Sequence, residues 1–96
     1  MRQRGRNEKY PNEIKVWRLG EPIPTWLSDV AKVKDVKGDG SMIIDIRMVD
    51  NDRGFEIIKP DNQILVRTNK NSDIICFGNK QFFVLTEKQL DLLYYE

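Results

Sequence analysis

The sequence predicts a small α+β domain in which most of the chain forms one antiparallel sheet. Turn-forming residues recur every 8 to 10 residues between short apolar runs, which is the spacing of strands joined by tight connections. Only two segments have helical spacing, and both are short. We therefore expect about five or six short strands with one early and one C-terminal helix, in a sheet that is either open or partly rolled into a barrel.

A first strand and a first helix are predicted on either side of a rigid turn. Residues 13–19 (EIKVWRL) include β-branched and aromatic residues, contain no strand breaker and end before Gly20. The two prolines of residues 20–24 restrict the residues before them and favour an extended connection. Thr25 is suited to be the N-cap of a helix over residues 25–33. Two apolar stripes follow the helical period there, namely Leu27, Val30 and Ala31, and Trp26, Val30 and Val33.

The clearest strand covers residues 42–49 (MIIDIRMV). Glycine and aspartate mark the turns on either side of it, at residues 37–41 and 50–54. Two sets of side chains alternate along the strand and point to opposite faces: apolar Met42, Ile44, Ile46 and Met48, and charged Asp45 and Arg47. One packed face and one partly wet face are typical of an antiparallel sheet.

Two hairpins are predicted in the second half of the chain. The first joins strands near residues 55–59 and 63–68, and residues 69–72 (NKNS) form the turn that follows it. The second joins DIICF (73–77) to QFFVL (81–85) across a Gly-Asn-Lys turn. Together the two hairpins supply most of the strands of the expected sheet.

The chain ends in a predicted helix that a capping box opens. The Thr86 side chain is placed to accept from the Gln89 amide, and the Gln89 side chain is placed to accept from the Thr86 amide. Leu90, Leu93 and Tyr94 follow at helical spacing and form one apolar stripe. We expect this stripe to dock the helix onto the sheet.

Residues 1–12 (MRQRGRNEKYPN) are predicted to be a basic flexible arm, and residues 13–96 to be a single domain. The arm has almost no apolar side chain, so it cannot bury enough surface to offset the entropy of an unfolded chain. Its positive charges are candidates for contacts with phosphates or with an acidic protein: Arg2, Arg4, Arg6 and Lys9.

Composition argues against catalysis. The 96-residue chain has no histidine, which removes the commonest general base and the commonest metal ligand. The single cysteine, Cys76, lies between apolar residues of a predicted strand and is expected to be a buried, inert thiol. The acidic residues near the turns lack the spacing of a calcium loop: Asp45, Asp50, Asp52 and Glu56. We expect a protein that is not an enzyme and that has no catalytic residue, no metal and no cofactor.

Charge and hydropathy favour a folded domain of the cytoplasm. The chain is 40% hydrophobic and 32% charged, with a formal net charge of +1, as is ordinary for a folded domain. No apolar run is long enough to cross a membrane, and no apolar segment of a secretory signal follows the N-terminus. A lone cysteine cannot form an internal disulfide, which suits a reducing compartment.

The end of the chain resembles a known family. The stretch NSDIICFGNKQFFVLTEKQLDLLYYE is similar to the C-terminal half of the small phage and prophage PGDYG proteins, in which a strand, a glycine turn, a second strand and a short helix follow one another. Asp73 matches the aspartate of their motif and Gly78 the turn glycine. Other positions of the motif hold different residues here, namely Asn71, Ser72 and Ile74. Upstream, EPIPTWLSDV is similar to the family's proline-containing strand and the start of its helix.

The resemblance covers residues 14–96. It implies a phage or prophage origin, a small α+β fold and a place in the cytoplasm of a bacterial host. It supplies no activity and no catalytic residue. With the composition, it leads to the expectation of an accessory protein that binds a host protein and thereby inhibits a host or defence process.

The sequence leaves several binding surfaces open. Phe82 and Phe83 point to opposite faces of their strand, so the outer one is a candidate contact for a partner, whereas Trp17 and Trp26 are expected in the core. Strand edges are further sites for pairing with a partner or with a second copy. One alternative is a nucleic-acid-binding module that uses the basic arm. Another is a protein that sequesters a small ligand at an oligomer interface.

Overall fold

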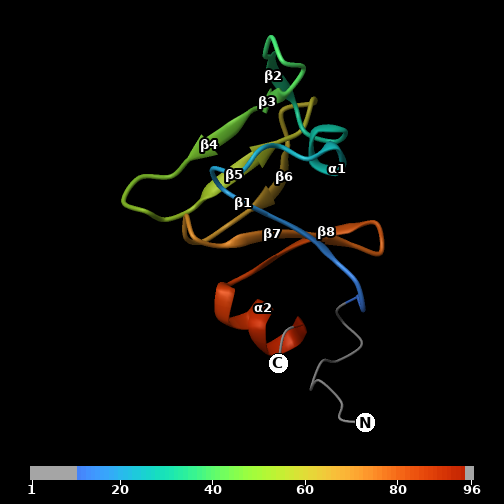
Figure 1. The fold of residues 1–96 in the computed structure, drawn as a ribbon. Coiled ribbons are helices and arrows are strands. Elements are labelled where there is room, and N and C mark those ends of the chain that lie inside the picture. The colour runs from blue at the N-terminus through green and yellow to red at the C-terminus, as the bar shows by residue number, and fades with distance from the viewer. Residues whose placement is uncertain (1–10, 95–96) are drawn as a thin grey trace.

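The structure is a computed structural model and describes residues 11–94 of the chain. In chain order its elements are β1 (Lys15–Arg18), α1 (Thr25–Ser28), β2 (Val33–Val36), β3 (Met42–Ile44), β4 (Ile46–Met48), β5 (Phe55–Ile58), β6 (Ile64–Arg67), β7 (Ile74–Gly78), β8 (Gln81–Leu85) and α2 (Glu87–Tyr94). Figure 1 shows the β2–β3 hairpin at one end of the molecule and α2 at the other, with the remaining strands between them.

The predicted fold class, α+β with antiparallel strands, is confirmed. Within residues 11–94 eight short strands form three small open sheets, with the orders β1-β7-β8, β2-β3 and β4-β5-β6. The strands differ from the expectation in number and grouping, since we expected five or six strands in one sheet. The two predicted hairpins are present as β5–β6 and β7–β8.

The early helix is shorter than predicted, because a turn follows it at residues 29–30 and a strand begins at Val33. The prediction of a helix over residues 25–33 with Thr25 as N-cap is wrong, because α1 ends at Ser28 and its N-cap is Pro24, which makes no side-chain cap bond. The segment after it is rich in β-branched valine, which suits a strand. It forms β2, and the pairing of Val36 with Met42 holds it against β3.

The predicted strand over residues 42–49 is present as one path that changes its partner at Asp45. Its first part, β3, pairs with β2, and its second part, β4, pairs with β5. The Asp45 amide donates to the Lys32 carbonyl at 2.8 Å, and the Asp45 carbonyl accepts from the Ile58 amide at 3.1 Å. The N–H and C=O of one strand residue point to the same side. Therefore β2 and β5 both lie on the same side of the 42–48 path.

The side chains of this path follow the predicted alternation only near its middle. Ile44 is buried and Ile46 is half-buried against the core, as expected. Met42 and Met48 were expected on the same packed face, but they are 39% and 50% exposed. They lie at the two ends of the path, beyond the reach of the core cluster.

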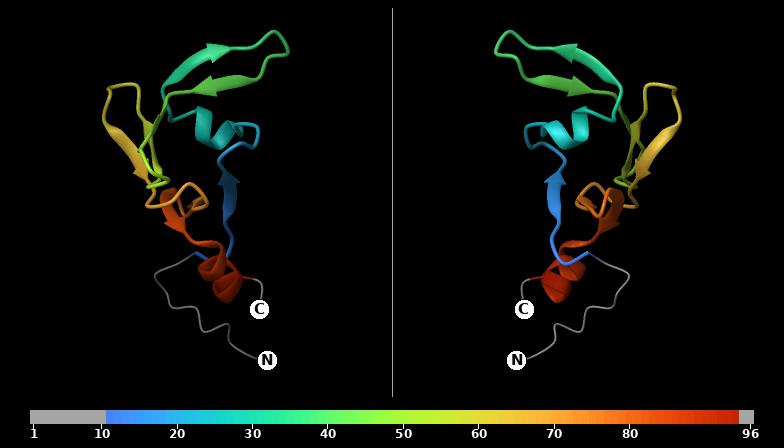
Figure 2. Two further views of the ribbon diagram at one scale, coloured as in Figure 1. Left: turned by 90° about the vertical axis from the view of Figure 1, so that its left-hand side faces the viewer. Right: turned by 90° about the vertical axis from the view of Figure 1, so that its right-hand side faces the viewer.

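Two apolar clusters cover the two faces of the β1-β7-β8 sheet, because successive strand residues point to opposite sides. The larger cluster contains Trp17, Leu27, Ala31, Ile44, Phe55, Ile57, Val66 and Ile75. The smaller one contains Ile74, Cys76, Leu85, Leu90 and Tyr94. The larger cluster joins this sheet to the β4-β5-β6 sheet and to α1, and the smaller one joins it to α2. Figure 2 shows α2 and the β2–β3 hairpin at opposite ends of this arrangement.

The predicted ending of the chain is confirmed in detail. The Thr86 amide donates to Oε1 of Gln89 at 2.9 Å, and the Gln89 amide donates to Oγ1 of Thr86 at 3.1 Å, which completes the capping box. Leu90 and Tyr94 are buried in the smaller cluster, and Leu93 packs against it. This helix therefore closes the outer face of the β1-β7-β8 sheet.

The turn between β7 and β8 carries an identifiable strain. Asn79 and Lys80 both have positive φ, at 51° and 61°, as a two-residue hairpin turn of the favoured kind requires. Asparagine tolerates this conformation, but an ordinary side chain such as that of lysine does so at a cost. We expect Lys80→Gly to raise the free energy of unfolding by about 0.5–1 kcal/mol. Urea unfolding measures the effect, with Lys80→Ala as the control that should bring no gain.

Candidate functional site: a groove beside an unpaired strand edge

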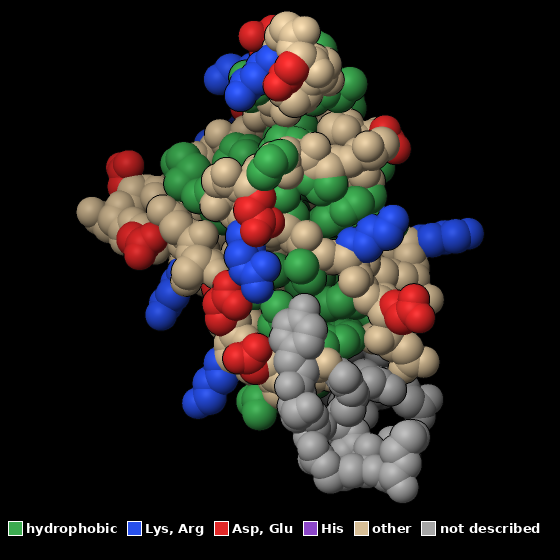
Figure 3. All heavy atoms as spheres, viewed as in Figure 1, with side chains coloured by type: hydrophobic (Ala, Val, Ile, Leu, Met, Phe, Trp, Pro, Cys, Tyr) green, Lys and Arg blue, Asp and Glu red, His purple; other side chains and the backbone are tan. Residues whose placement is uncertain are grey.

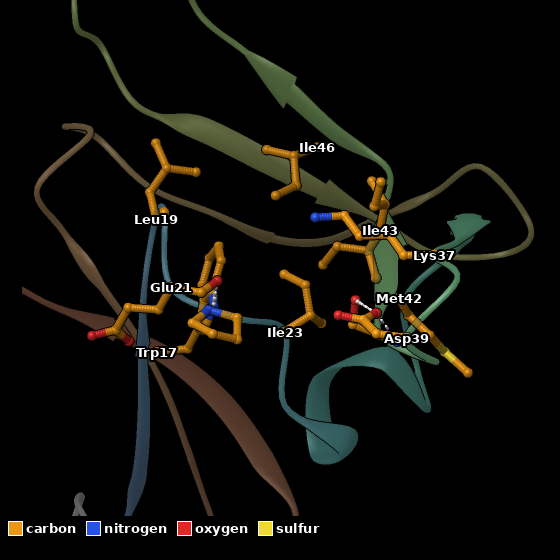
Figure 4. A pocket seen from close by; sticks show the side chains of 13 residues that line it. Trp17, Leu19, Glu21, Ile23, Lys37, Asp39, Met42, Ile43 and Ile46 are labelled. Carbon is orange, nitrogen blue, oxygen red and sulfur yellow. Dashed lines mark hydrogen bonds between the residues drawn. The ribbon is translucent and has the colours of Figure 1, made fainter.

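An open groove of about 470 Å³ lies between the β1–α1 connection and the strand path of β3 and β4. One wall is formed by residues 17–23, and the other by residues 37–46 of the β2–β3 hairpin and the start of β4. Most of the lining is apolar: Trp17, Leu19, Pro22, Ile23, Met42, Ile43, Ile44 and Ile46. Figure 4 shows Leu19 and Trp17 facing Ile43 and Ile46 across the groove, with Ile23 between them.

The wall formed by residues 42–48 presents a strand edge that has no partner within the described chain. Lys37 N–H donates to the Ser41 carbonyl, and Val49 N–H donates to the Gly54 carbonyl, so residues 41, 45 and 49 all direct their main chain toward β2 and β5. Alternate residues of a strand direct these groups to the opposite side. The groups on the opposite side belong to Met42, Ile44, Ile46 and Met48, and β3 and β4 have no strand neighbour there among residues 11–94.

The opposite wall is held in place by local hydrogen bonds. The Glu21 amide donates to the Arg18 carbonyl at 3.0 Å, which closes a tight turn in which Gly20 has a φ of 99°. The Glu21 carboxylate accepts from the Arg18 amide at 2.9 Å. The Glu21 carbonyl accepts from the indole N–H of the buried Trp17 at 3.0 Å. This wall is therefore a preformed surface.

The groove contains one cation that makes no ion pair within the described residues. The Lys37 side chain extends into the groove beside Ile43 (Figure 4). Asp39 lies nearby, but its Oδ1 accepts from the Ser41 hydroxyl at 2.6 Å and from the Ser41 amide at 2.9 Å. These bonds with Ser41, helped by the charge of Lys37, hold the pKa of Asp39 below its usual value. Lys37 is the one cation that lines the groove, and the carboxylates of Asp39 and Glu21 line it as well.

The hairpin that carries Lys37 also exposes apolar side chains outside the groove. Val33 and Val36 are 40% and 54% exposed. A two-stranded hairpin is marginal on its own, and contiguous exposed apolar side chains mark surfaces that bind other proteins. Figure 3 shows apolar side chains gathered on the surface beneath this hairpin.

The site residues that were predicted from the sequence have different outcomes. Arg2, Arg4, Arg6 and Lys9 lie outside the described residues, so their proposed role stays a prediction. Phe82 and Phe83 do point to opposite faces, with Phe82 packed against the larger cluster and Phe83 against the smaller one, beneath α2. Neither phenylalanine lines the groove.

The two tryptophans have different surroundings. Trp17 is 2% exposed and meets Phe55 edge to face, so its core position is confirmed. Trp26 is half-buried and packs against the larger cluster, and its ring stacks on that of Phe77 with 5.8 Å between centroids. Phe77 also contacts Phe82 at 4.6 Å, which makes a small aromatic cluster at the end of the β7–β8 hairpin.

Acidic side chains are used within the fold. Glu56 is buried between Arg47 and Arg67, with 3.3 Å from each guanidinium nitrogen to a carboxylate oxygen, across the β4-β5-β6 sheet. Asp61 accepts from the Gln63 amide at 3.0 Å in its turn. In the part of the chain that the structure describes, no three potential ligands gather closely enough to hold a metal ion. Nor does any helix of that part have the length and apolarity to cross a membrane.

Cys76 is fully buried in the smaller cluster, and desolvation raises the pKa of its thiol from 9.0 to about 12. Above pH 9 an unfolded thiol loses its proton whereas the folded one keeps it, so stability should fall between about pH 9 and pH 12. We expect the free energy of unfolding to fall by about 1 kcal/mol more in the natural protein than in Cys76→Ala between pH 8 and pH 10. Urea unfolding at both pH values measures this difference, and equal slopes would contradict the assignment.

Comparisons of the chain with protein-family models, with curated proteins and with solved structures give no match. Sequence reasoning missed this site because its walls lie about twenty residues apart in the chain. The sequence signal that could have indicated this site is the run MIIDI. It has apolar residues at consecutive positions, whereas a strand with one solvent-exposed face needs them only at alternate positions.

Proposed function

We propose that this chain is a non-enzymatic protein-binding module of phage or prophage origin, which occupies the surface of a host protein and thereby inhibits a host or defence process. The observation that supports it most is the unpaired edge of residues 42–48 beside an apolar groove. Exposed strand edges pair readily with other chains, and natural proteins usually cover or charge them. An edge left apolar and open suits a protein whose role is to bind another one.

Two further observations support a binding role over a catalytic one. Most of the groove lining is apolar, and the Ser41 hydroxyl and the Asp39 carboxylate at its rim are bonded to each other, which closes the β2–β3 turn. The one thiol of the chain is buried away from the groove. The phage or prophage origin rests on the resemblance of residues 14–96 to the PGDYG proteins.

Capture of partners from a bacterial lysate tests the proposal. The tagged full chain is incubated with the lysate, and the bound proteins are identified by mass spectrometry against a tag-only control. We expect one host protein in stoichiometric amount, whose activity falls when the purified chain is added. Recovery of the tagged chain alone would overturn the proposal.

The basic arm supports nucleic acid as an alternative partner, and a salt series distinguishes the two. Binding through phosphates weakens steeply with salt. Binding of DNA or RNA that is lost when residues 1–9 are removed would favour this alternative, whereas no binding at low salt would exclude it. The groove could also take a small ligand, which would raise the unfolding temperature of the chain without turnover.

A further inference from the structure

We infer that the groove binds an extended peptide segment that pairs as an additional strand with the edge of residues 42–48, and that this segment carries apolar side chains at alternate positions and a carboxylate opposite Lys37. This inference rests on the proposed function and specifies its site and the chemistry of its partner. No other element of the described chain occupies this position.

The main chain of the edge determines the conformation of the occupant. Met42, Ile44, Ile46 and Met48 each direct an N–H and a C=O to the side away from β2 and β5. The ends of this edge are the most exposed, at Met42 and Met48, whereas Ile44 is 3% exposed. Groups at every second residue are matched by another strand and are not matched by a helix or a compact ligand. Asp45 keeps the edge continuous, because its bonds to Lys32 and Ile58 join β3 to β4 without a break in the path.

The groove determines which side chains the occupant carries. In an added strand every second side chain points to the same face, and the face that enters the groove meets Leu19, Ile23 and Ile43. These walls favour apolar side chains such as valine or isoleucine, whose burial contributes to affinity. The intervening side chains point away from the groove and are free to be polar.

Lys37 determines the charge of the occupant. Its ammonium enters the groove, while the nearby carboxylate of Asp39 is engaged by Ser41 and that of Glu21 by the Arg18 amide. A carboxylate on the incoming segment would pair with Lys37 in surroundings that are partly shielded from water.

The far wall favours a single segment over a second copy of this chain. Residues 19–23 face the edge across the groove, so the occupant has to fit between two walls. A second copy that offered its own edge would bring its own 19–23 segment alongside, and the two walls would meet. A peptide segment without neighbouring structure has no such obstacle.

Selection from a displayed library of random dodecapeptides on the immobilised full chain tests this inference, and binding of the selected peptides is measured by calorimetry. We expect peptides with alternating apolar residues and an aspartate or glutamate. Met42→Pro removes one edge N–H and should weaken binding about tenfold, which is clearly more than the effect of Met42→Ala, because that variant keeps the N–H and loses only side-chain contacts. Lys37→Glu should weaken binding by a similar factor, and Lys34→Glu, on the same hairpin, should not.

A second measurement leaves the protein unchanged, which protects the test if Met42→Pro fails to fold. Two sets of alternate backbone nitrogens of a selected peptide are methylated in turn. Methylation of the set that faces the edge should abolish binding, and methylation of the other set should preserve it, because only one set of amides pairs with the edge. The inference would be overturned if both sets of methylated peptides lost binding equally, or if Lys37→Glu left the affinity of the peptides unchanged. Selection of no peptide at all would also overturn it. So would a dimer of the chain that Met42→Pro dissociates, since the edge would then belong to a second copy.

The two proposals fail in distinguishable ways. A host protein that the natural chain and Met42→Pro capture equally well would leave the proposed function standing and place binding elsewhere. Capture of no host protein together with no selected peptide would overturn both.

Discussion

Replacing Gly54 with alanine is expected to lower the free energy of unfolding by about 4 kcal/mol or more, which is the range of severe substitutions. Gly54 is buried and has a φ of 99°, a backbone conformation that side chains rarely adopt. A Cβ at this position would lie 2.3 Å from the carbonyl oxygen of Thr68 and 2.7 Å from its carbonyl carbon. Both atoms belong to the backbone, so no side-chain rotation relieves the overlap.

Gly54 lies close to Thr68 because the two residues flank paired strands. Gly54 comes directly before β5, and Thr68 comes directly after β6, where the chain turns toward β7. The Gly54 amide donates to Oδ1 of Asn71 at 3.1 Å, and the Phe55 amide donates to Oγ1 of Thr68 at 3.0 Å. The Asp73 carboxylate accepts from the amides of residues 69 and 70, which closes the connection into β7. These bonds position the β4-β5-β6 sheet against the β1-β7-β8 sheet, so a side chain at Gly54 would separate the two.

Urea unfolding of Gly54→Ala measures this effect, and Gly38→Ala is the matched control. Gly38 has no atom within 4 Å of the position of a Cβ and lies in the exposed β2–β3 turn. We expect its replacement to change stability by less than about 0.5 kcal/mol. A loss at Gly54 no larger than that at Gly38 would show that the strand connection yields easily to a side chain.

Local signals predicted parts of this fold well. The capping box of Thr86 and Gln89 and the β7–β8 hairpin depend on residues that are close in sequence, and both are present. The β2 strand was missed because its valines also continue the helical spacing of the preceding segment. Only the pairing with β3, six to eleven residues later, decides between the two conformations. Tertiary pairing thus overrides local spacing there.

The sequence predicted the kind of candidate site but not its position. Sequence reasoning expects a strand edge to be a binding surface, but it cannot say which edge stays open, because that depends on how three sheets divide eight strands. The same limit applies to the Phe82–Phe83 pair. The alternation of a strand places them on opposite faces, whereas the cover that Phe83 receives from α2 follows from where the helix docks. The local pattern therefore predicts the individual strands and helices, whereas their packing determines which surfaces and edges stay exposed.

Replacing Leu90 with alanine is expected to lower the free energy of unfolding by about 3 kcal/mol, because the side chain is fully buried and the cavity left behind is only partly refilled. Leu90 lies in the smaller cluster with Ile74, Cys76 and Leu85, so it holds α2 on the outer face of the β1-β7-β8 sheet. The bidentate bond of Arg18 to Glu87, with 2.7 Å and 3.1 Å between the paired atoms, makes a second contact between β1 and α2. It lies at the exposed surface, where such pairs contribute little, so it should not replace the lost packing.

The thiol of Cys76 reports directly whether α2 stays docked. It lies beneath the helix with no exposed surface, and thiol reagents react with the thiolate, which burial disfavours. We expect Leu90→Ala to raise the labelling rate of Cys76 well before global unfolding, because the terminal helix opens more easily than the sheets. Leu92→Ala is the control, since Leu92 is 61% exposed on the same helix and its loss should change neither stability nor labelling. Labelling of Leu90→Ala at the rate of the Leu92→Ala control would mean that the helix stays docked without the Leu90 contact, and that the rest of the cluster is sufficient to close this face of the sheet.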